Sequence, residues 1–154
     1  MYKLLPLLAC LSCTASSPPP VEIPTNPDAF SKYEFLFQEY TGIKTDMPIV
    51  FGFFYDPETL AQCRYNNDLR VMPIDHIVVD PVSWSELDAI EREVLILHEL
   101  AHCVLKRNHE KKVFEDGSPA TLMFPRLTGD EVDSYVNRKC EVLENTFGFK
   151  PLKC

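Results

Sequence analysis

Residues 94–109 read VLILHELAHCVLKRNH, and this stretch decides how the chain folds. Apolar residues recur at helical spacing through it and just before it, at Leu87, Ile90, Val94, Leu97, Ala101 and Val104. A stripe with that period predicts an amphipathic helix with one face in the core. Residues 83–86, Ser-Trp-Ser-Glu, have the spacing of a capping box, so we expect a single helix of about six turns to begin there.

Two histidines lie on one face of this predicted helix. His98 and His102 are four residues apart, and positions four apart on a helix differ by about 40° in rotation and one turn in rise. Both imidazoles can therefore bind one Zn²⁺ ion, at about 2.0–2.1 Å each. Glu99 points about 100° away from His98, beside the metal rather than on it. That position suits a general base that takes a proton from a metal-activated water and passes it to a leaving amine.

A catalytic zinc site usually has three protein ligands, so a third donor is needed. In an unbroken helix, His109 would lie about 10 Å further along the axis, out of reach. The chain must therefore turn back after about Leu105, and Asn108 is a residue that tolerates the left-handed conformation. We expect His109 to be the third ligand, with Glu110 or Asp116 as its substitute.

The whole pattern resembles that of the metzincin zinc proteases, the matrixins in particular. The shared features are His98-Glu99-x-x-His102, a later histidine, and the stretch 121–125, Thr-Leu-Met-Phe-Pro. In those enzymes a tight turn with a methionine lies beneath the metal, and Met123 matches that position. The resemblance covers about residues 74–127 and implies a zinc metallopeptidase.

Two features of the chain depart from the metzincin pattern. Where that pattern has a glycine at the turn, this chain has Leu105 or Lys106, and where it has the third histidine, this chain has Asn108. We interpret this as a turn that is one residue longer. The chain is also similar to exported bacterial metallopeptidases with His-Glu-x-x-His-Cys and a displaced third histidine.

The rest of the chain predicts an α+β domain of minimal zincin type. Asn26 as N-cap and Pro27 begin a helix that ends at Gly42. Strand patterns at 49–55, 60–65 and 74–79 predict a small, mostly antiparallel or mixed sheet, in which His76 has a structural or surface role rather than a metal role. A second capping box at 128–131 opens a C-terminal helix that runs to about Thr146 and stops at Gly148.

The N-terminal residues predict export. We divide the chain into a signal peptide at 1–15, a proline-rich tether at 16–26 and a zinc metallopeptidase domain at 27–154. Residues 7–10, Leu-Leu-Ala-Cys, resemble a bacterial lipobox, so Cys10 is a candidate for lipidation and Cys13 is a second one. The protein would then be a membrane-anchored lipoprotein, periplasmic or at the cell surface. The alternative is an ordinary secretory signal cut near Ala15.

The other four cysteines fit two disulfides in an exported domain. They are Cys63, Cys103, Cys140 and Cys154. Four cysteines allow three connectivities, and the sequence does not choose between them. We favour Cys63 with Cys103 and Cys140 with Cys154.

Charge and length limit the partners. The 154 residues allow one domain, and 23 acidic against 15 basic residues give a net charge of -8, which argues against nucleic acid. We expect a monomeric zinc endopeptidase whose peptide or protein substrate lies extended along a sheet edge. The alternative is a non-catalytic, zinc-stabilised envelope lipoprotein that binds a partner, but a metal-only scaffold would not need Glu99. A cell-wall peptide substrate fits the same residues.

Overall fold

The computed structural model describes residues 28–65 and 75–154. The elements in these ranges are α1 (Asp28–Thr41), β1 (Ile49–Phe51), β2 (Ala61–Arg64), β3 (His76–Val79), α2 (Pro81–Glu86), α3 (Ala89–Cys103), α4 (Gly129–Asn137) and α5 (Lys139–Phe147). The fold is α+β with a small mixed sheet, as the sequence predicts. The leader, the tether, Asn26, Pro27 and both lipidation candidates lie outside the described residues.

The sheet has the strand order β1-β3-β2. β1 runs parallel to β3, with Ile49 opposite Ile77, and β2 runs antiparallel to β3, with Cys63 opposite Ile77. All four residues of β3 are buried because it is the central strand. The paired segments are shorter than the predicted strands. Strand β2 is at the edge of this sheet, so only one of its two sides is paired with β3.

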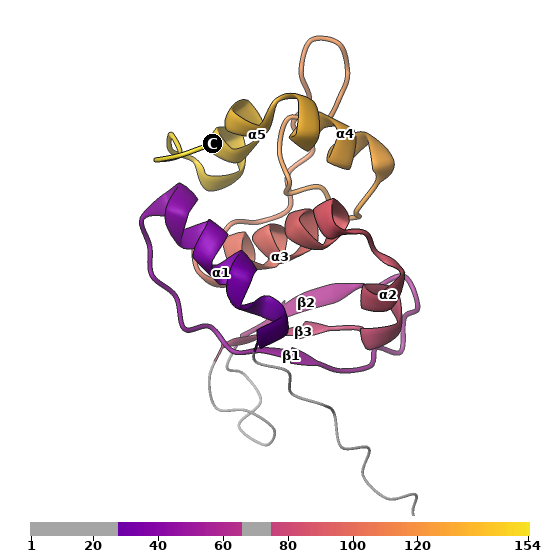
Figure 1. Ribbon diagram of the computed structural model, residues 1–154. Coiled ribbons are helices and arrows are strands. Elements are labelled where there is room, and N and C mark those ends of the chain that lie inside the picture. The colour runs from indigo at the N-terminus through magenta and orange to yellow at the C-terminus, as the bar shows by residue number, and fades with distance from the viewer. Residues whose placement is uncertain (1–27, 66–74) are drawn as a thin grey trace, which may run out of the picture.

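Helix α3 lies between two groups of elements. In Figure 1 the sheet lies on one side of α3, and α4 and α5 lie on the other, with α1 alongside. The core contains residues from all of these elements, including Phe37 of α1, Ile77 of β3, Leu97 of α3 and Leu143 of α5. Burial of such aromatic and aliphatic side chains supplies most of the stabilisation. Helix α3 is consequently held on both faces.

A polar cluster adds to this packing around α3. Glu93 accepts hydrogen bonds from the hydroxyl of Tyr135 in α4 and from Nζ of Lys139 in α5, the latter at 2.9 Å. The hydroxyl of Tyr40 in α1 lies 3.5 Å from the same oxygen. Burial and the neighbouring Glu93 carboxylate raise the pKa of the Tyr135 phenol, so it stays a hydrogen-bond donor. One carboxylate thus links four helices.

The predicted long helix is in fact two helices, and the expected cap at Ser83 is wrong. Asp80 caps α2 and accepts from the backbone N–H of Ser83, whereas Asp88 caps α3 in a capping box with Glu91. The chain is extended between them, at Leu87. A tertiary contact satisfies the exposed end of α2, because Nε of Arg92 donates to the carbonyl of Trp84 at 3.0 Å.

The predicted C-terminal helix is also divided. Thr128 is the N-cap, as expected, and Gly148 ends the second helix with φ 81°, but Arg138 leaves the helical conformation between α4 and α5. The Arg138 guanidinium pairs with Asp116 and lies 4.5 Å from the ring centroid of Phe114. These contacts with the segment before α4 compensate for the break. Gly42, with φ 73°, ends α1 as predicted.

Two disulfides join the cysteines in the pairing that we favoured. Cys63 of β2 is bonded to Cys103 at the end of α3, and Cys140 of α5 to Cys154 near the C-terminus. The first closes a separation of 40 residues and the second one of 14. The first therefore ties an edge strand to the helix that carries His98 and His102.

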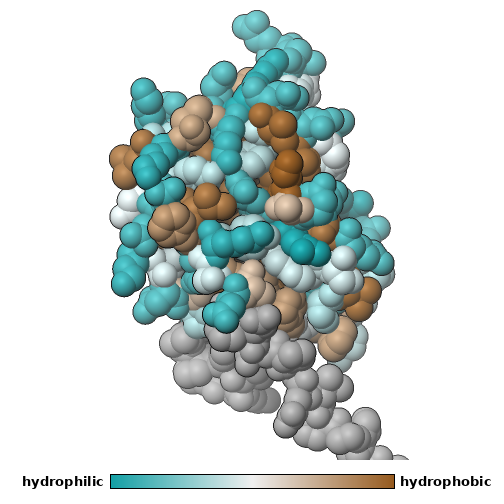
Figure 2. Space-filling view, viewed as in Figure 1, coloured by the Kyte–Doolittle hydropathy of each residue, from teal (hydrophilic) through white to brown (hydrophobic). Residues whose placement is uncertain are grey.

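Hydrophilic residues cover much of the face shown in Figure 2, with hydrophobic residues scattered among them. Among the described residues, none of the helices is long and apolar enough to cross a membrane.

Candidate metal centre

The two histidines of α3 face the same point, as their spacing predicts. Their ring centroids are 4.6 Å apart, and their Nε2 atoms are 2.9 Å apart. Each ring is held from behind at Nδ1: that of His98 by the carbonyl of Leu122 and that of His102 by the carbonyl of Arg107, at 2.6 Å. With Nδ1–H donated to a carbonyl, the lone pair of each ring lies on Nε2, which points to the shared space.

A tight turn after α3 brings the third histidine back. The left-handed residue is Lys106, with φ 55°, and not Asn108 as we had predicted. The N–H of Arg107 donates to the carbonyl of Ala101 at 3.1 Å and closes the turn. Lys106 bears a side chain where glycine would be least strained, but its Nζ pairs with Asp75 at 2.8 Å. The turn thus forms without a glycine.

His109 completes a group of three. Its ring centroid is 5.4 Å from that of His98 and 4.7 Å from that of His102. One ligand atom from each ring lies within 4.8 Å of the others. Within the described residues, neither of the expected substitutes belongs to this group: Glu110 accepts from Arg107, and Asp116 accepts from Ser118. The predicted ligands are therefore the ones that the fold brings together.

The donor set fits a metal ion that prefers nitrogen. Burial lowers the pKa of His98 to about 4 and also lowers the pKa of His102, so both rings are neutral near pH 7, the state in which imidazole binds metal. Three imidazoles whose ligand atoms lie close together, two of them with Nδ1–H donated to carbonyls, form a nitrogen ligand set that could hold a metal ion.

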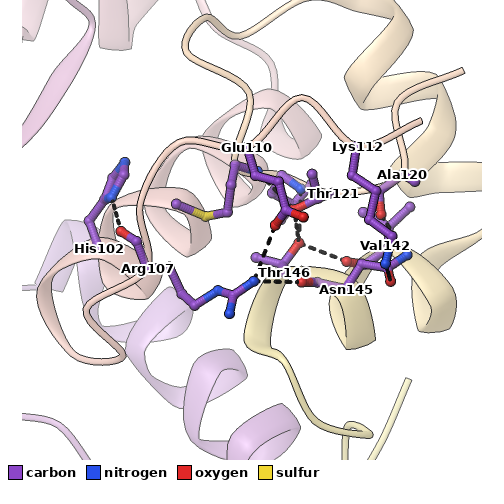
Figure 3. Close-up of polar contacts among 11 residues, drawn as sticks. His102, Arg107, Glu110, Lys112, Ala120, Thr121, Val142, Asn145 and Thr146 are labelled. Carbon is purple, nitrogen blue, oxygen red and sulfur yellow. Dashed lines mark hydrogen bonds and ion pairs between the residues drawn. The ribbon is translucent and has the colours of Figure 1, made fainter.

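A network behind the histidines holds the loop that supports them (Figure 3). The hydroxyl of Thr146 in α5 accepts from the N–H of Leu122 at 2.8 Å, and Leu122 in turn accepts from His98. Asn145 donates to the carbonyl of Ala120 at 2.9 Å. The carbonyl of Asn145, in the same helix, accepts a hydrogen bond from the guanidinium of Arg107. α5 thus fixes both carbonyl-bearing segments that orient the rings.

Sequence reasoning missed these supporting residues. Thr146 was predicted only as the end of a helix, and Asn145 and Arg107 had no predicted role. A buried threonine in a helix was their one signal, since such a hydroxyl needs a partner. Its partner lies 24 residues earlier in the chain, and no local pattern indicates that separation.

Glu99 lies beside the histidines and is almost fully buried, at 4% exposure. Its Oε2 accepts from the backbone N–H of Cys63 at 2.6 Å, and its Oε1 lies 4.0 Å from Nε2 of His98. Burial raises the pKa of the Glu99 carboxyl to about 7, and the Cys63 N–H opposes this shift. The carboxyl is therefore beside the metal position, as predicted, with one oxygen held and the other directed to the histidines.

The group opens into a cleft of about 470 Å³. One wall is β2 with the loop before it, and the other includes Glu131 of α4 and residues 124–127 before that helix. Lining residues include Leu60, Ala61, Gln62, Cys63, Tyr65, Phe124, Pro125, Arg126, Leu127 and Glu131, besides the three histidines and Glu99. The hydroxyl of Tyr65 donates to the carbonyl of His102 at 2.9 Å. The cleft reaches the three histidines.

Met123 and His76 are both buried, away from solvent. The carbonyl of Met123 accepts from the N–H of Glu110 at 2.7 Å, and Leu122 just before it supports His98. The segment that resembles a Met-turn thus runs along the histidine loop. His76 begins the central strand, outside the three-histidine group.

A comparison with models of protein families finds a match. The model of a family described as "Putative phage metallopeptidase" matches residues 30–126, which is more than half of the chain. The matched segment runs from α1 to the loop after Met123 and contains Glu99 and all three histidines of the group. No curated protein and no solved structure matches the chain.

Proposed function

The chain belongs to this family of phage metallopeptidases, and from that premise we propose that it is a zinc-dependent endopeptidase. One observation carries the proposal. Three imidazoles converge on one point at the base of a cleft, and a buried carboxylate lies beside them. A metal site that served only to stabilise the fold would have a closed ligand set and no use for that carboxylate.

The metal that we propose is Zn²⁺, held by His98, His102 and His109. Three protein nitrogens leave a coordination position free, as in catalytic zinc sites. When bound, zinc supplies a Lewis acid that polarises a carbonyl and makes water acidic enough to react near neutral pH.

Glu99 is the proposed general base. Because the Cys63 N–H holds Oε2, the side chain cannot rotate freely, and Oε1 stays directed toward the histidine side, 4.0 Å from Nε2 of His98. Oε1 is thus the atom that would take the proton from the attacking water and return it to the leaving amine. Burial excludes bulk water from this exchange.

The substrate that we propose is an extended peptide along β2. This strand lies at the edge of the sheet and lines the cleft with Ala61, Gln62 and Cys63. Since the N–H of Cys63 points away from β3, toward Glu99, Ala61 of the same parity presents its backbone groups to the cleft as well. Backbone pairing would position a peptide without requiring a particular sequence.

Two finer assignments belong to the same proposal. The histidine spacing and the position of Met123 support a metzincin type, with Lys106 in place of the glycine at the turn. Two disulfides support an exported location, because such bonds persist in oxidising compartments. Anchoring by a lipid at Cys10 or Cys13 is part of this proposal, as is a monomeric state.

The experiment is cleavage of a mixed peptide library by the zinc-loaded protein, read by mass spectrometry, with Glu99→Gln as the matched control. We expect cleavage that is lost on chelation, restored by Zn²⁺ and absent in the variant, while the variant keeps one zinc per chain. Firm zinc binding without any cleavage would contradict the proposal and favour a binding lipoprotein instead.

A further inference from the structure

Glu131 is a buried carboxyl that the proposed reaction does not use. It is the third residue of α4, only 1% exposed, and it lines the same cleft as His98 and Glu99. Its Oε2 has no hydrogen-bond partner in the described part of the chain. Three buried side-chain atoms of the described residues lack a partner, those of Tyr33, Arg107 and Glu131, and among them only that of Glu131 belongs to a residue that lines the cleft.

A buried carboxyl with an unpaired oxygen destabilises the folded protein. Burial raises the pKa of Glu131 to about 8, and the backbone N–H of Thr128 opposes the shift. The first turn of a helix favours negative charge. In the first turn of α4, however, Oε2 of Glu131 still has no hydrogen-bond donor. An apolar residue of similar size would remove this cost. The arrangement is that of a receptor for a group that is not part of this chain.

The rest of the cleft indicates what that group is. Val94, Leu95 and Leu127 give it apolar walls, which suit the aliphatic stem of a long side chain. Among the described residues that line it, Arg126 is the only lysine or arginine, and its guanidinium is paired with Glu58 at 2.7 Å. The unpaired group in the cleft is therefore an acid, and a cationic end on an apolar stem would favour its ionised form and pair with it.

We infer that Glu131 is a specificity-determining residue, whose carboxylate receives the positively charged end of a lysine or arginine side chain of the peptide substrate. The inference rests on the proposed function, because it assigns a side-chain preference to the same cleft. A hydrogen-bonded charge pair in a site that excludes water discriminates strongly against a neutral analogue, since the buried partner would be left unpaired.

The test compares peptides that differ by one charge. Lysine is set against norleucine, and arginine against citrulline, at each position of an otherwise neutral peptide. For the wild-type protein we expect kcat/KM to be about 10- to 100-fold higher for the cationic member of a pair at one position. In Glu131→Gln that ratio should fall to near 1, whereas Glu58→Gln, which removes an exposed cleft charge, should keep it.

A binding experiment separates this inference from the proposed function. Kd is measured by calorimetry for the same peptides with zinc-loaded Glu99→Gln, which does not consume them, and with Glu99→Gln/Glu131→Gln. A preference for the cationic peptide that disappears in the double variant supports the inference even if the wild type cleaves nothing. Equal wild-type kcat/KM and equal Kd for cationic and neutral peptides would overturn the inference and leave the peptidase proposal standing. If Glu131→Gln fails to fold, the inference is judged by two ratios between cationic and neutral peptides: that of kcat/KM for the wild type and that of Kd for Glu99→Gln.

Discussion

Removing the Cys63–Cys103 disulfide should cost both stability and activity, whereas removing Cys140–Cys154 should cost stability alone. The first bond closes 40 residues and the second 14. A loop-closure entropy of about 2.1 + 1.5R ln n cal/mol/K gives roughly 3.9 and 3.0 kcal/mol at 25 °C. For a chain of this size each kcal/mol shifts Tm by about 2–4 °C, so we expect losses of about 8–16 °C and 6–12 °C.

The activity difference follows from the position of the first bond. Cys63 donates its N–H to Glu99, and its side chain anchors β2 to α3. Without that anchor the strand can move by a fraction of an ångström to an ångström, which is enough to lower kcat/KM by about 10- to 100-fold.

The assay uses two alanine pairs, Cys63→Ala/Cys103→Ala and Cys140→Ala/Cys154→Ala. Tm is read by circular dichroism at one zinc concentration, and kcat/KM is measured well below either Tm. The second pair is the matched control, because neither of its cysteines lines the cleft. Equal loss of kcat/KM in both variants, or a larger loss of Tm in the second pair, would refute the reasoning.

Three further predictions concern single residues. His109→Ala should weaken zinc binding by more than about 100-fold in a chelator competition, because it removes one of three ligands, and unchanged affinity would exclude His109. Thr146→Val leaves the N–H of Leu122 unpaired, so the free energy of unfolding measured in urea should fall by about 1–3 kcal/mol and zinc binding should weaken. An unchanged unfolding midpoint would show that the hydroxyl is dispensable. The folded-state pKa of Glu131 is about 8, above its ordinary value of 4.5, so its contribution to stability is full below pH 4.5 and lost as the pH rises to about 8. Relative to Glu131→Gln, wild-type unfolding free energy should therefore fall by at most about 1.4 kcal/mol per pH unit in that window, and parallel curves would contradict the burial argument.

The site was predictable from the sequence because its parts are close in the chain. His98, Glu99 and His102 are placed by helical spacing alone, and the need for a third ligand then indicates His109. The turn between them was not placed correctly. Asn108 has the better intrinsic tolerance for the left-handed conformation, but Lys106 adopts it and its Nζ pairs with Asp75. That contact cannot be read from local sequence.

The helix boundaries show the same limit. Residues 83–86 and 88–91 both have the spacing of a capping box, and only the second is used. The contact of Arg92 with Trp84 compensates for the break in the helix at Leu87. The contact of Arg138 with Asp116 compensates for the break between α4 and α5. Sequence periodicity predicts which face of a helix is buried, but side chains from elsewhere determine where the helix ends.

The residues proposed for catalysis and the residues that form the cleft walls come from different segments of the chain. The proposed metal ligands and Glu99 all lie within residues 98–109, on one helix and the turn that follows it. The β2 wall and Glu131 come from about 35 residues before and about 30 after Glu99. The two walls can therefore vary by substitution or insertion while the metal ligands stay in place. Related chains can acquire new peptide preferences without having to rebuild the chemistry that cuts the peptide.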